Sequence, residues 1–313
     1  MKGKDLLSIA DLNRDNIRLL LSGAEEFKSK DGNSALSGKV LALLFEKPSL
    51  RTRVSFEVAM YRLGGKALYL SPAEVGLGKR ESVKDVACVL SRFVDIIAVR
   101  TFSHKTVEEL AKYAAVPVIN ALSDFEHPCQ ALADVLTINE KKGALEGLTI
   151  AYIGDPNNVS NSLMLVAALC GMNFRVASPR GYKIDEGVLH LAQSYAEESS
   201  VEIIWTEDPR IAASGADVVY TDTWVSMGQE EEAEKRRRAF EGFQVNGKLM
   251  SLAKKEAVFM HCLPAHRGEE VSDEVIDSAA SVVYDQAENR MHIARAILLY
   301  LLGELKNSPT GYR

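Results

Sequence analysis

The sequence of 313 residues predicts an α/β protein of two domains, each a mostly parallel sheet with helices on both faces. Two observations predict this class. Short apolar runs alternate along the chain with segments whose apolar residues recur at helical spacing. A polar break at 141–147 divides the alternation into two series. We expect one domain over 1–140, a second over 147–288, and a C-terminal helix, 289–313, that packs back on the first domain.

The first series begins with a segment, 5–28, that has the apolar spacing of a helix. Strands are expected after it at 40–45, 66–70, 95–100 and 117–120. Helices are expected at 52–63, 82–93, 105–115 and 128–142. Gly64 and Gly65 mark the end of the first of these helices.

The second series predicts strands at 148–153, 173–177, 201–205, 217–220, 257–260 and 282–284. The helices between them are expected at 162–170, 187–198, 230–240, 246–252 and 272–280. Open α/β sheets bind ligands beyond the C-terminal ends of their strands. Polar clusters follow several strands of both series, so we expect the active site in a cleft between the two domains.

Composition excludes several classes of protein. The net charge of -6 argues against a non-specific nucleic-acid binder. No apolar run approaches the roughly 20 residues of a membrane span, and the N-terminus lacks the apolar core of a signal peptide. The four cysteines are widely spaced and resemble neither a zinc site nor a disulfide framework. A cytoplasmic protein without nucleic-acid or membrane partners fits best.

The segment Pro48-Ser49-Leu50-Arg51-Thr52-Arg53 lies where a strand turns into a helix. Free N–H groups and the positive end of the dipole favour an anion at such a point. The Ser49 and Thr52 hydroxyls add donors, and Arg51 adds a planar fork suited to phosphate. Arg53 lies four residues before Glu57 and is placed to pair with it. The alternative is a polar helix start with surface charges.

Three further residues follow strands of the first series. Arg100 ends one strand and is a second possible ligand for an anion or a carbonyl oxygen, although a surface ion pair would explain it equally. His127 and Gln130 flank Pro128, which suits the first position of a helix. An imidazole there can donate to a carbonyl oxygen, and the alternative is a histidine that only caps the helix.

In the second series the segment 154–158 has the position of a dinucleotide loop but lacks the later glycines of that motif. Its two asparagines, Asn157 and Asn158, are better suited to hydrogen-bonding a small polar ligand. Asp222 follows an apolar strand, with a turn as the alternative. Cys262 ends another strand and is either a substrate contact or an inert core thiol. Arg290, expected in the first turn of the last helix, has an ion pair with Glu288 or Asp285 as its alternative.

Taken together, four motifs occur in the order found in one known family. They are Ser49-x-Arg51-Thr52-Arg53, His127-Pro-x-Gln130, Asp222-x-Trp224-x-Ser226-Met227-Gly228 and His261-Cys262-Leu263-Pro264. The chain resembles the aspartate/ornithine carbamoyltransferase family over nearly its full length. The first two motifs are shared by both branches, and the last two point to the ornithine branch. The resemblance implies the reaction of carbamoyl phosphate with L-ornithine to L-citrulline and phosphate, in arginine metabolism, without metal or organic cofactor.

The resemblance also implies roles for single residues. One set would bind carbamoyl phosphate: Ser49, Leu50, Arg51, Thr52, Arg100, His127, Gln130, Cys262, Leu263 and Arg290. A second set would bind ornithine: Asn158, Asp222, Ser226 and Met227. The catalytic residues would be Arg100, His127, Asp222 and Cys262. We expect positioning and electrostatics to supply most of the rate, with no covalent Cys262 intermediate.

The family further implies a homotrimer in which the loop 71–82 reaches a neighbour's site. Here the sequence departs from a common pattern, because Gly76 falls where many members have glutamine and Leu50 replaces threonine or glycine. Lys79 or Arg80 would then take over the neighbour's contribution. Carbamoyl transfer to aspartate, putrescine or N-acetylornithine stays an alternative, as does a non-catalytic binding relative. A nicotinamide-dependent dehydrogenase is disfavoured by the missing glycine fingerprint.

Overall fold

The computed structural model describes residues 4–29, 34–78, 80–199, 201–226 and 228–305. The chain divides into two compact units. Unit 1 comprises Met1–Leu136 together with Glu288–Arg313, and unit 2 comprises Thr137–Ala287. Each unit contains one parallel sheet with helices on both faces, so the predicted class is confirmed. Within the described residues, no helix combines the length and the apolar character that crossing a membrane requires.

The sheet of unit 1 has four parallel strands in the order β2-β1-β3-β4. They are β1 (Val40–Phe45), β2 (Lys66–Leu70), β3 (Ile96–Arg100) and β4 (Val118–Leu122). The central strands β1 and β3 are almost wholly buried and, except for Arg100 at the end of β3, apolar, as expected when both faces of a sheet are covered. Because β1, β3 and β4 are neighbours, the loops that follow them lie at one edge of the sheet.

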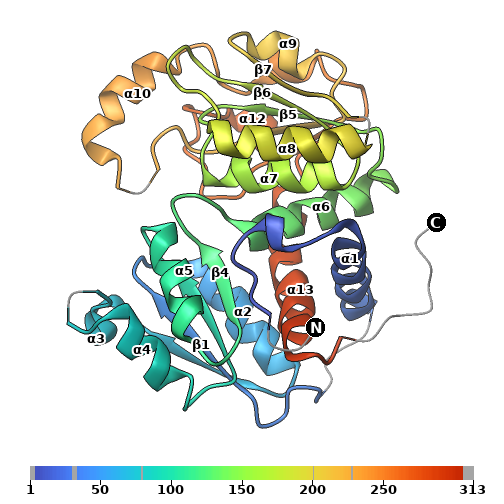
Figure 1. The fold of residues 1–313 in the computed structure, drawn as a ribbon. Helices are drawn as coiled ribbons and strands as arrows, with labels where there is room; N and C mark the ends of the chain where they lie inside the picture. Colours follow the sequence, from blue (N-terminus) through green and yellow to red (C-terminus); the bar gives the residue numbers. More distant parts are fainter. Residues whose placement is uncertain (1–3, 30–33, 79, 200, 227, 306–313) are drawn as a thin grey trace. The chain divides into compact units, whose positions relative to one another are not determined.

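The helices of unit 1 are α1 (Arg14–Ser29), α2 (Leu50–Arg62), α3 (Pro72–Val75), α4 (Val83–Leu90), α5 (His104–Tyr113), the start of α6 (Pro128–Lys142) and most of α13 (Val283–Leu302). The pair α4 and α5 covers one face, where Val86 and Val107 pack on Ala42 and Val99. In Figure 1 α13 lies beside α1. Arg295 of α13 joins these two helices, since it donates to the carbonyl oxygen of Phe27 at 2.9 Å.

The sheet of unit 2 has five parallel strands in the order β7-β6-β5-β8-β9. They are β5 (Thr149–Ile153), β6 (Asn173–Ala177), β7 (Ile203–Thr206), β8 (Val218–Thr221) and β9 (Val258–Met260). The helices α7 (Asn158–Leu169) and α8 (Glu186–Ser199) lie side by side in Figure 1. The core on the other face includes residues of α9 (Pro209–Ala213), α11 (Gly247–Met250) and α12 (Asp273–Ile276), with Phe240 following α10 (Ala233–Ala239).

The N-terminal expectation is wrong over residues 5–13. A short 3-10 helix, Ile9–Asp11, occupies this segment, and α1 begins only at Arg14. Leu6 instead forms a parallel bridge with Ile119, next to β4 at the edge of the sheet. Its N–H donates to the Val118 carbonyl at 2.9 Å, because the outer side of β4 offers unpaired backbone groups. The apolar spacing that suggested a helix arises from residues buried by this docking.

The strand expected at 282–284 is also absent from the described structure. One bridge joins Ser281 to Phe259, and α13 then begins at Val283. The two β-branched valines continue a short apolar run and so imitate a strand. As a consequence, residues 285–290 are helical and not a loop, and Arg290 lies well inside α13 and not in its first turn.

Candidate active site

The first group of polar residues gathers at the C-terminal edge of the unit 1 sheet. Ser49 and Thr52 follow β1, Arg100 ends β3, and His127 and Gln130 follow β4. Strand order alone brings these three segments together, since β1, β3 and β4 are consecutive in the sheet. Arg290 joins them from α13. We call Thr52, Arg100, His127, Gln130 and Arg290 the cationic cluster; all five are at least nine-tenths buried.

Helix α2 begins beside this cluster with a conventional cap. The Ser49 hydroxyl accepts the backbone N–H of Thr52 at 3.3 Å, and Ser49 itself has extended backbone angles. Leu50 and Arg51 occupy the first turn, where backbone N–H groups have no partner within the helix. The Leu50 side chain is 74% exposed, so only its backbone is suited to a ligand. Arg51 is half-buried next to it.

Two guanidinium groups converge on one hydroxyl. Arg290 donates to the Thr52 Oγ1 atom at 2.7 Å, and Arg100 approaches the same oxygen at 3.5 Å. A hydroxyl has two acceptor positions and one donor hydrogen. With both acceptor positions directed at cations, the hydrogen of Thr52 is left to donate. Two buried positive charges and a hydroxyl donor at a helix start make this point attractive to an anion.

His127 is buried beside these arginines. Burial lowers the pKa of its imidazole well below the usual value, and the positive charges of Arg290 and Arg100 lower it further. The ring is therefore neutral at neutral pH, with one N–H donor and one acceptor nitrogen. Its carbonyl accepts the N–H of Gln130 at 3.1 Å as α6 begins, so the residue also shapes that helix start.

The Gln130 side chain is fixed by a neighbour on the same helix. Its Nε2 donates to the Oδ1 atom of Asp134 at 2.7 Å, and both residues are fully buried. Residues four apart lie on one face of a helix, so α6 itself imposes this pairing. Among the described residues, no hydrogen-bond partner lies within reach of the Gln130 Oε1 atom.

The second group lies at the C-terminal edge of the unit 2 sheet. Asn157 follows β5, Asp222 follows β8 and Cys262 follows β9, and these strands are consecutive in the sheet. Gly154 directly follows β5 with a φ of +138°, and a side chain there would meet Thr221 Oγ1 at 3.4 Å and the Asp222 carbonyl at 3.6 Å. Glycine thus permits the two loops to approach closely.

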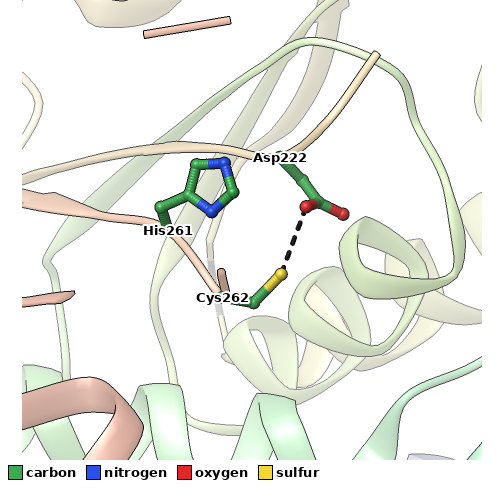
Figure 2. A group of neighbouring side chains, drawn as sticks. All are labelled: Asp222, His261 and Cys262. Atoms are coloured by element: carbon green, nitrogen blue, oxygen red, sulfur yellow. Dashed lines mark hydrogen bonds between the residues drawn. The ribbon is translucent and has the colours of Figure 1, made fainter. Parts of the chain in front are cut away.

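The Asp222 carboxylate is held by two donors. Cys262 Sγ lies 3.2 Å from its Oδ1 atom, and Asn157 Nδ2 donates to its Oδ2 atom at 2.8 Å. Figure 2 shows the thiol and the carboxylate pointing toward each other, with His261 beside them. We call Asn157, Asp222 and Cys262 the carboxylate–thiol cluster. It presents a fixed negative charge with a polarisable sulfur next to it.

A buried ion pair joins two of the loops that carry this cluster. Arg236 donates to Asp155 Oδ2 at 2.9 Å and to the Trp224 carbonyl at 3.3 Å, so it ties the loop after β5 to the loop after β8. Burial raises the pKa of Asp155 to about 6, although Arg236 opposes that rise. Asp155 therefore begins to take up a proton when the pH falls slightly below neutral.

His261 is a structural residue and not a free ligand. Its Nδ1 accepts the Leu263 N–H at 2.9 Å, which leaves the hydrogen on Nε2, 3.2 Å from Glu270 Oε1. Asp222, His261 and Cys262 lie close enough to share a metal ion. Both ring nitrogens of His261 are however engaged, so this set of donors does not fit a metal site without loss of a buried hydrogen bond.

The remaining predicted residues are placed as follows. Asn158 is the first residue of α7, Ser226 is half-buried after β8, and Leu263 follows Cys262 with a φ of +59°. Met227 lies outside the described residues. Arg53 pairs with Glu57 at 2.9 Å and stacks on Tyr69, as expected for a structural residue.

The loop with the sequence departure is also partly described. Gly76 adopts a left-handed φ of +56° as the C-cap of α3. Arg80 donates to the Glu74 carbonyl at 3.2 Å, within its own loop. Lys79 lies outside the described residues.

Sequence reasoning missed Asp134, the hydrogen bond of Asn157 to Asp222, and the Asp155–Arg236 pair. A signal existed for Asp134, because a carboxylate four residues after Gln130 shares its helix face. A signal for Asn157 also existed, since a residue before an apolar helical run is an N-cap candidate. Its side chain does accept the Val159 N–H at 2.9 Å. No local signal pointed to Arg236, which lies 81 residues from Asp155.

Comparison with known proteins gives these clusters a context. Residues 4–140 match the carbamoyl-P binding domain of aspartate/ornithine carbamoyltransferase, and residues 146–301 match the Asp/Orn binding domain of the same family. The chain therefore belongs to the aspartate/ornithine carbamoyltransferase family. The cationic cluster lies largely in the first match and the carboxylate–thiol cluster in the second.

Individual relatives are similar over their whole lengths. An ornithine carbamoyltransferase of Anoxybacillus flavithermus is 54% identical, with 96% of this chain and 98% of the relative covered. The solved ornithine carbamoyltransferase of Pyrococcus furiosus is 53% identical with a TM-score of 0.94, covering 97% of this chain and 99% of that one. An N-acetyl-L-ornithine transcarbamylase structure is more distant, at 34% identity and a TM-score of 0.87 over 95% of this chain and 99% of that one.

Proposed function

We propose that this protein is an ornithine carbamoyltransferase, a transferase that converts carbamoyl phosphate and L-ornithine to L-citrulline and phosphate. One observation carries the proposal most strongly. Arg100 and Arg290 converge on the Thr52 hydroxyl at the start of α2, where the chain offers a buried, doubly cationic place for a phosphorylated substrate. Similarity to ornithine carbamoyltransferases over whole chains supports the same substrate pair.

The phosphate group is assigned to the start of α2. Ser49, Arg51, Thr52 and the backbone of Leu50 bind it, because N–H groups, hydroxyls and a guanidinium at a helix N-terminus together favour a dianion. Arg100, His127 and Gln130 bind the carbamoyl group, and Arg290 lies next to it. Neutral His127 suits this role, since it can donate to a carbonyl oxygen without adding another charge.

The reaction needs no covalent enzyme intermediate. The uncharged δ-amine of ornithine attacks the carbamoyl carbon, and the carbonyl oxygen becomes an oxyanion that Arg100 and His127 stabilise. The C–O bond to phosphate then breaks, the carbonyl re-forms, and the departing phosphate accepts the proton that the amine loses. Free alkylamines have a pKa near 10, so desolvation and orientation of the amine are the main tasks of the binding site.

The amino-acid substrate is assigned to unit 2. Asp222 binds its α-ammonium group, with Asn158, Ser226 and Met227 around the amino-acid end, and Cys262 and Leu263 lie beside the side-chain amine. The fixed carboxylate of Asp222 supports a free α-amino group, because an acylated amine has no charge for it to meet. This reasoning favours ornithine over N-acetylornithine. The Pyrococcus furiosus relative is named anabolic, and we assign this chain to arginine biosynthesis on that likeness.

The assembly is proposed to be a homotrimer in the cytoplasm. Exposed apolar side chains on one stripe of α2 support an interface: Leu50 at 74%, Val54 at 46% and Tyr61 at 81% exposure. Leu68, on the edge strand β2, is 50% exposed. Arg80 and Lys79 are the candidates for a contribution to a neighbour's site. All four cysteines are free thiols, which suits a reducing compartment.

The acceptor assay tests the proposal. Citrulline formation is measured from carbamoyl phosphate and L-ornithine, with aspartate, putrescine and N-acetylornithine in parallel. We expect turnover with ornithine and at most traces with the other amines. Turnover with another amine would keep the carbamoyl phosphate assignment, and turnover with N-acetylornithine would refute the role of Asp222. A folded protein inactive with every acceptor would instead support a non-catalytic relative.

A further inference from the structure

The two ends of the Gln130 side-chain amide differ in their hydrogen bonding. Its Nε2 donates at 2.7 Å to Asp134, whereas no described residue offers a hydrogen bond to its Oε1. Both residues are fully buried, so water does not readily replace a missing partner. A buried amide oxygen without a donor is costly, and its presence at a candidate site points to a donor that a ligand brings.

We propose that Asp134 is a positioning residue that fixes the orientation of the Gln130 amide and thereby makes the site selective for an amide-bearing acyl phosphate. The inference rests on the proposed function and adds the residue that sets its selectivity. A carboxylate has only acceptor oxygens. Asp134 therefore admits the NH₂ end of Gln130 and rejects the carbonyl end, which forces Oε1 to be the atom available to a ligand.

This orientation discriminates between two substrates of almost equal size. Carbamoyl phosphate has an NH₂ group that can donate to Oε1, whereas acetyl phosphate has a methyl group in its place. With the amide locked, the methyl group leaves Oε1 without a donor, and a buried unsatisfied acceptor costs enough for a difference of about tenfold to a hundredfold. If Gln130 were free to rotate, its NH₂ end could face the ligand, where it would meet the NH₂ group of carbamoyl phosphate donor against donor and so weaken the preference for the amide.

Geometry makes Asp134 the residue that can impose this lock. It lies one turn after Gln130 on α6, and a helix holds positions four apart on one face. The rotation of the amide is thus set by helix geometry and is present before any ligand binds. Pre-organised polar groups of this kind favour the intended ligand at little cost in ordering.

The test uses two stable analogues, phosphonoacetamide and acetonylphosphonate, which differ only in NH₂ against CH₃. Calorimetric titration gives the ratio of their Kd values for wild type, Asp134→Asn, Gln130→Ala and the double variant. We expect wild type to prefer the amide by at least tenfold. Asp134→Asn accepts either end of the Gln130 amide, so the preference should fall to within about threefold.

The double variant distinguishes positioning from a general structural effect. If Asp134 acts through Gln130, Asp134→Asn in the Gln130→Ala background leaves the ratio unchanged, although either change can lower absolute affinity. Asp95→Asn is the matched control. This carboxylate lies just before β3, at the other end of the strand from Arg100, and accepts from Val40 and Lys39. Its ratio should equal that of wild type.

Retention of the wild-type ratio in folded Asp134→Asn would overturn the inference, and so would a further fall in the double variant. Should Asp134→Asn not fold, a crystal structure of wild type with phosphonoacetamide tests the inference instead. The inference requires the ligand nitrogen on Gln130 Oε1 while Nε2 stays on Asp134. A ligand nitrogen turned away from Gln130 would refute it. Failure of the carbamoyl phosphate assignment has a different signature, because wild type would then bind neither analogue.

Discussion

The two units have polar side chains at the same edge of a parallel sheet, but the charges of these side chains are opposite. In both, consecutive strands of a parallel sheet bring separate polar loops to one edge. The cationic cluster of unit 1 orients two arginines on the Thr52 hydroxyl. The carboxylate–thiol cluster of unit 2 orients one carboxylate with a thiol and an amide. The contrast shows that the fold brings separate loops together at the C-terminal edge of a sheet. The side chains on those loops determine whether the edge suits an anion or a cation.

Burial also acts in opposite directions on the titratable groups of the two units. It lowers the pKa of His127 and raises the pKa of Asp155, because it disfavours the charged form of each. Unit 1 thus keeps a neutral donor among positive charges, and unit 2 keeps a carboxylate that depends on Arg236 for its ionisation.

The largest effect is expected at Arg100, to which the proposed function assigns both binding and polarisation of the carbamoyl group. Arg100→Gln should lower kcat for citrulline formation by about 10³ and raise KM for carbamoyl phosphate, because a buried charge is lost where the oxyanion forms. Arg53→Gln is the matched control on α2. Its ion pair with Glu57 is solvent-exposed, so kcat should stay within about twofold. Equal losses in both variants would contradict a specific role for Arg100.

Asp222→Asn should affect the other substrate. Loss of a charged partner for the α-ammonium group should raise KM for ornithine by about tenfold to a hundredfold and leave that for carbamoyl phosphate within twofold. Steady-state kinetics with each substrate varied in turn measures the split. Asp273→Asn, an exposed carboxylate paired with Arg267, is the control. A parallel rise in KM for carbamoyl phosphate would contradict the division of labour.

Cys262→Ala is expected to have a smaller effect. In the proposed reaction the thiol orients Asp222 and contacts the substrate but forms no bond with it, so kcat should fall by about tenfold with binding of carbamoyl phosphate largely intact. Rapid quenching and mass spectrometry test the same point in wild type. A carbamoyl–Cys262 adduct formed and consumed at the rate of turnover would refute a non-covalent reaction.

The pKa of His127 should respond to an anion. In free enzyme the group stays neutral well below pH 6.5, and a bound phosphonate opposes the charges of Arg290 and Arg100 and so raises its pKa. NMR titration with and without phosphonoacetamide, assigned through His127→Asn, measures this shift. An unchanged or lowered pKa on binding would place the anion elsewhere.

His127 also has a definite sign in stability. Its folded pKa lies below the unfolded value, so the unfolded chain binds the extra proton and stability falls as the pH drops below about 6.5. Above that pH the group contributes no dependence. Between pH 7 and pH 5 the free energy of unfolding of His127→Asn should therefore fall by about 1–2 kcal/mol less than that of wild type.

Asp155 has the opposite sign. Its folded pKa of about 6 exceeds the unfolded value of 3.8, so its contribution is present at low pH and is lost as the pH rises through about 6. As the pH is lowered from 7 to 5, the free energy of unfolding of wild type should rise by about 1 kcal/mol relative to that of Asp155→Asn. Denaturant unfolding followed by tryptophan fluorescence reports on unit 2, which contains both tryptophans, Trp205 and Trp224. A wild type that gains nothing over this range would show that Arg236 outweighs burial.

Much of this arrangement was predictable because it is local. The sequence placed β6 and α6 at their observed bounds, and it identified the polar residues after β1, β3, β4, β8 and β9. Such signals depend on periodicity, proline position and strand ends, all of which lie within short windows of sequence.

What escaped prediction depends on pairing across the fold. Leu6 leaves helical spacing because the edge of β4 offers it backbone partners. Val283 begins a helix because the ladder beside Phe259 ends after one bridge. Arg236 finds Asp155 from 81 residues away. Tertiary contacts of this kind decide between local alternatives that the sequence leaves equally favourable.

The measurement that tests the central contrast most directly is calorimetric titration of phosphonoacetamide into two variants, Arg100→Gln and Asp222→Asn. The assignment of the anion to the cationic cluster predicts that binding is lost or weakened by at least tenfold in the first and kept within twofold in the second. Weakened binding in Asp222→Asn with normal binding in Arg100→Gln would contradict it.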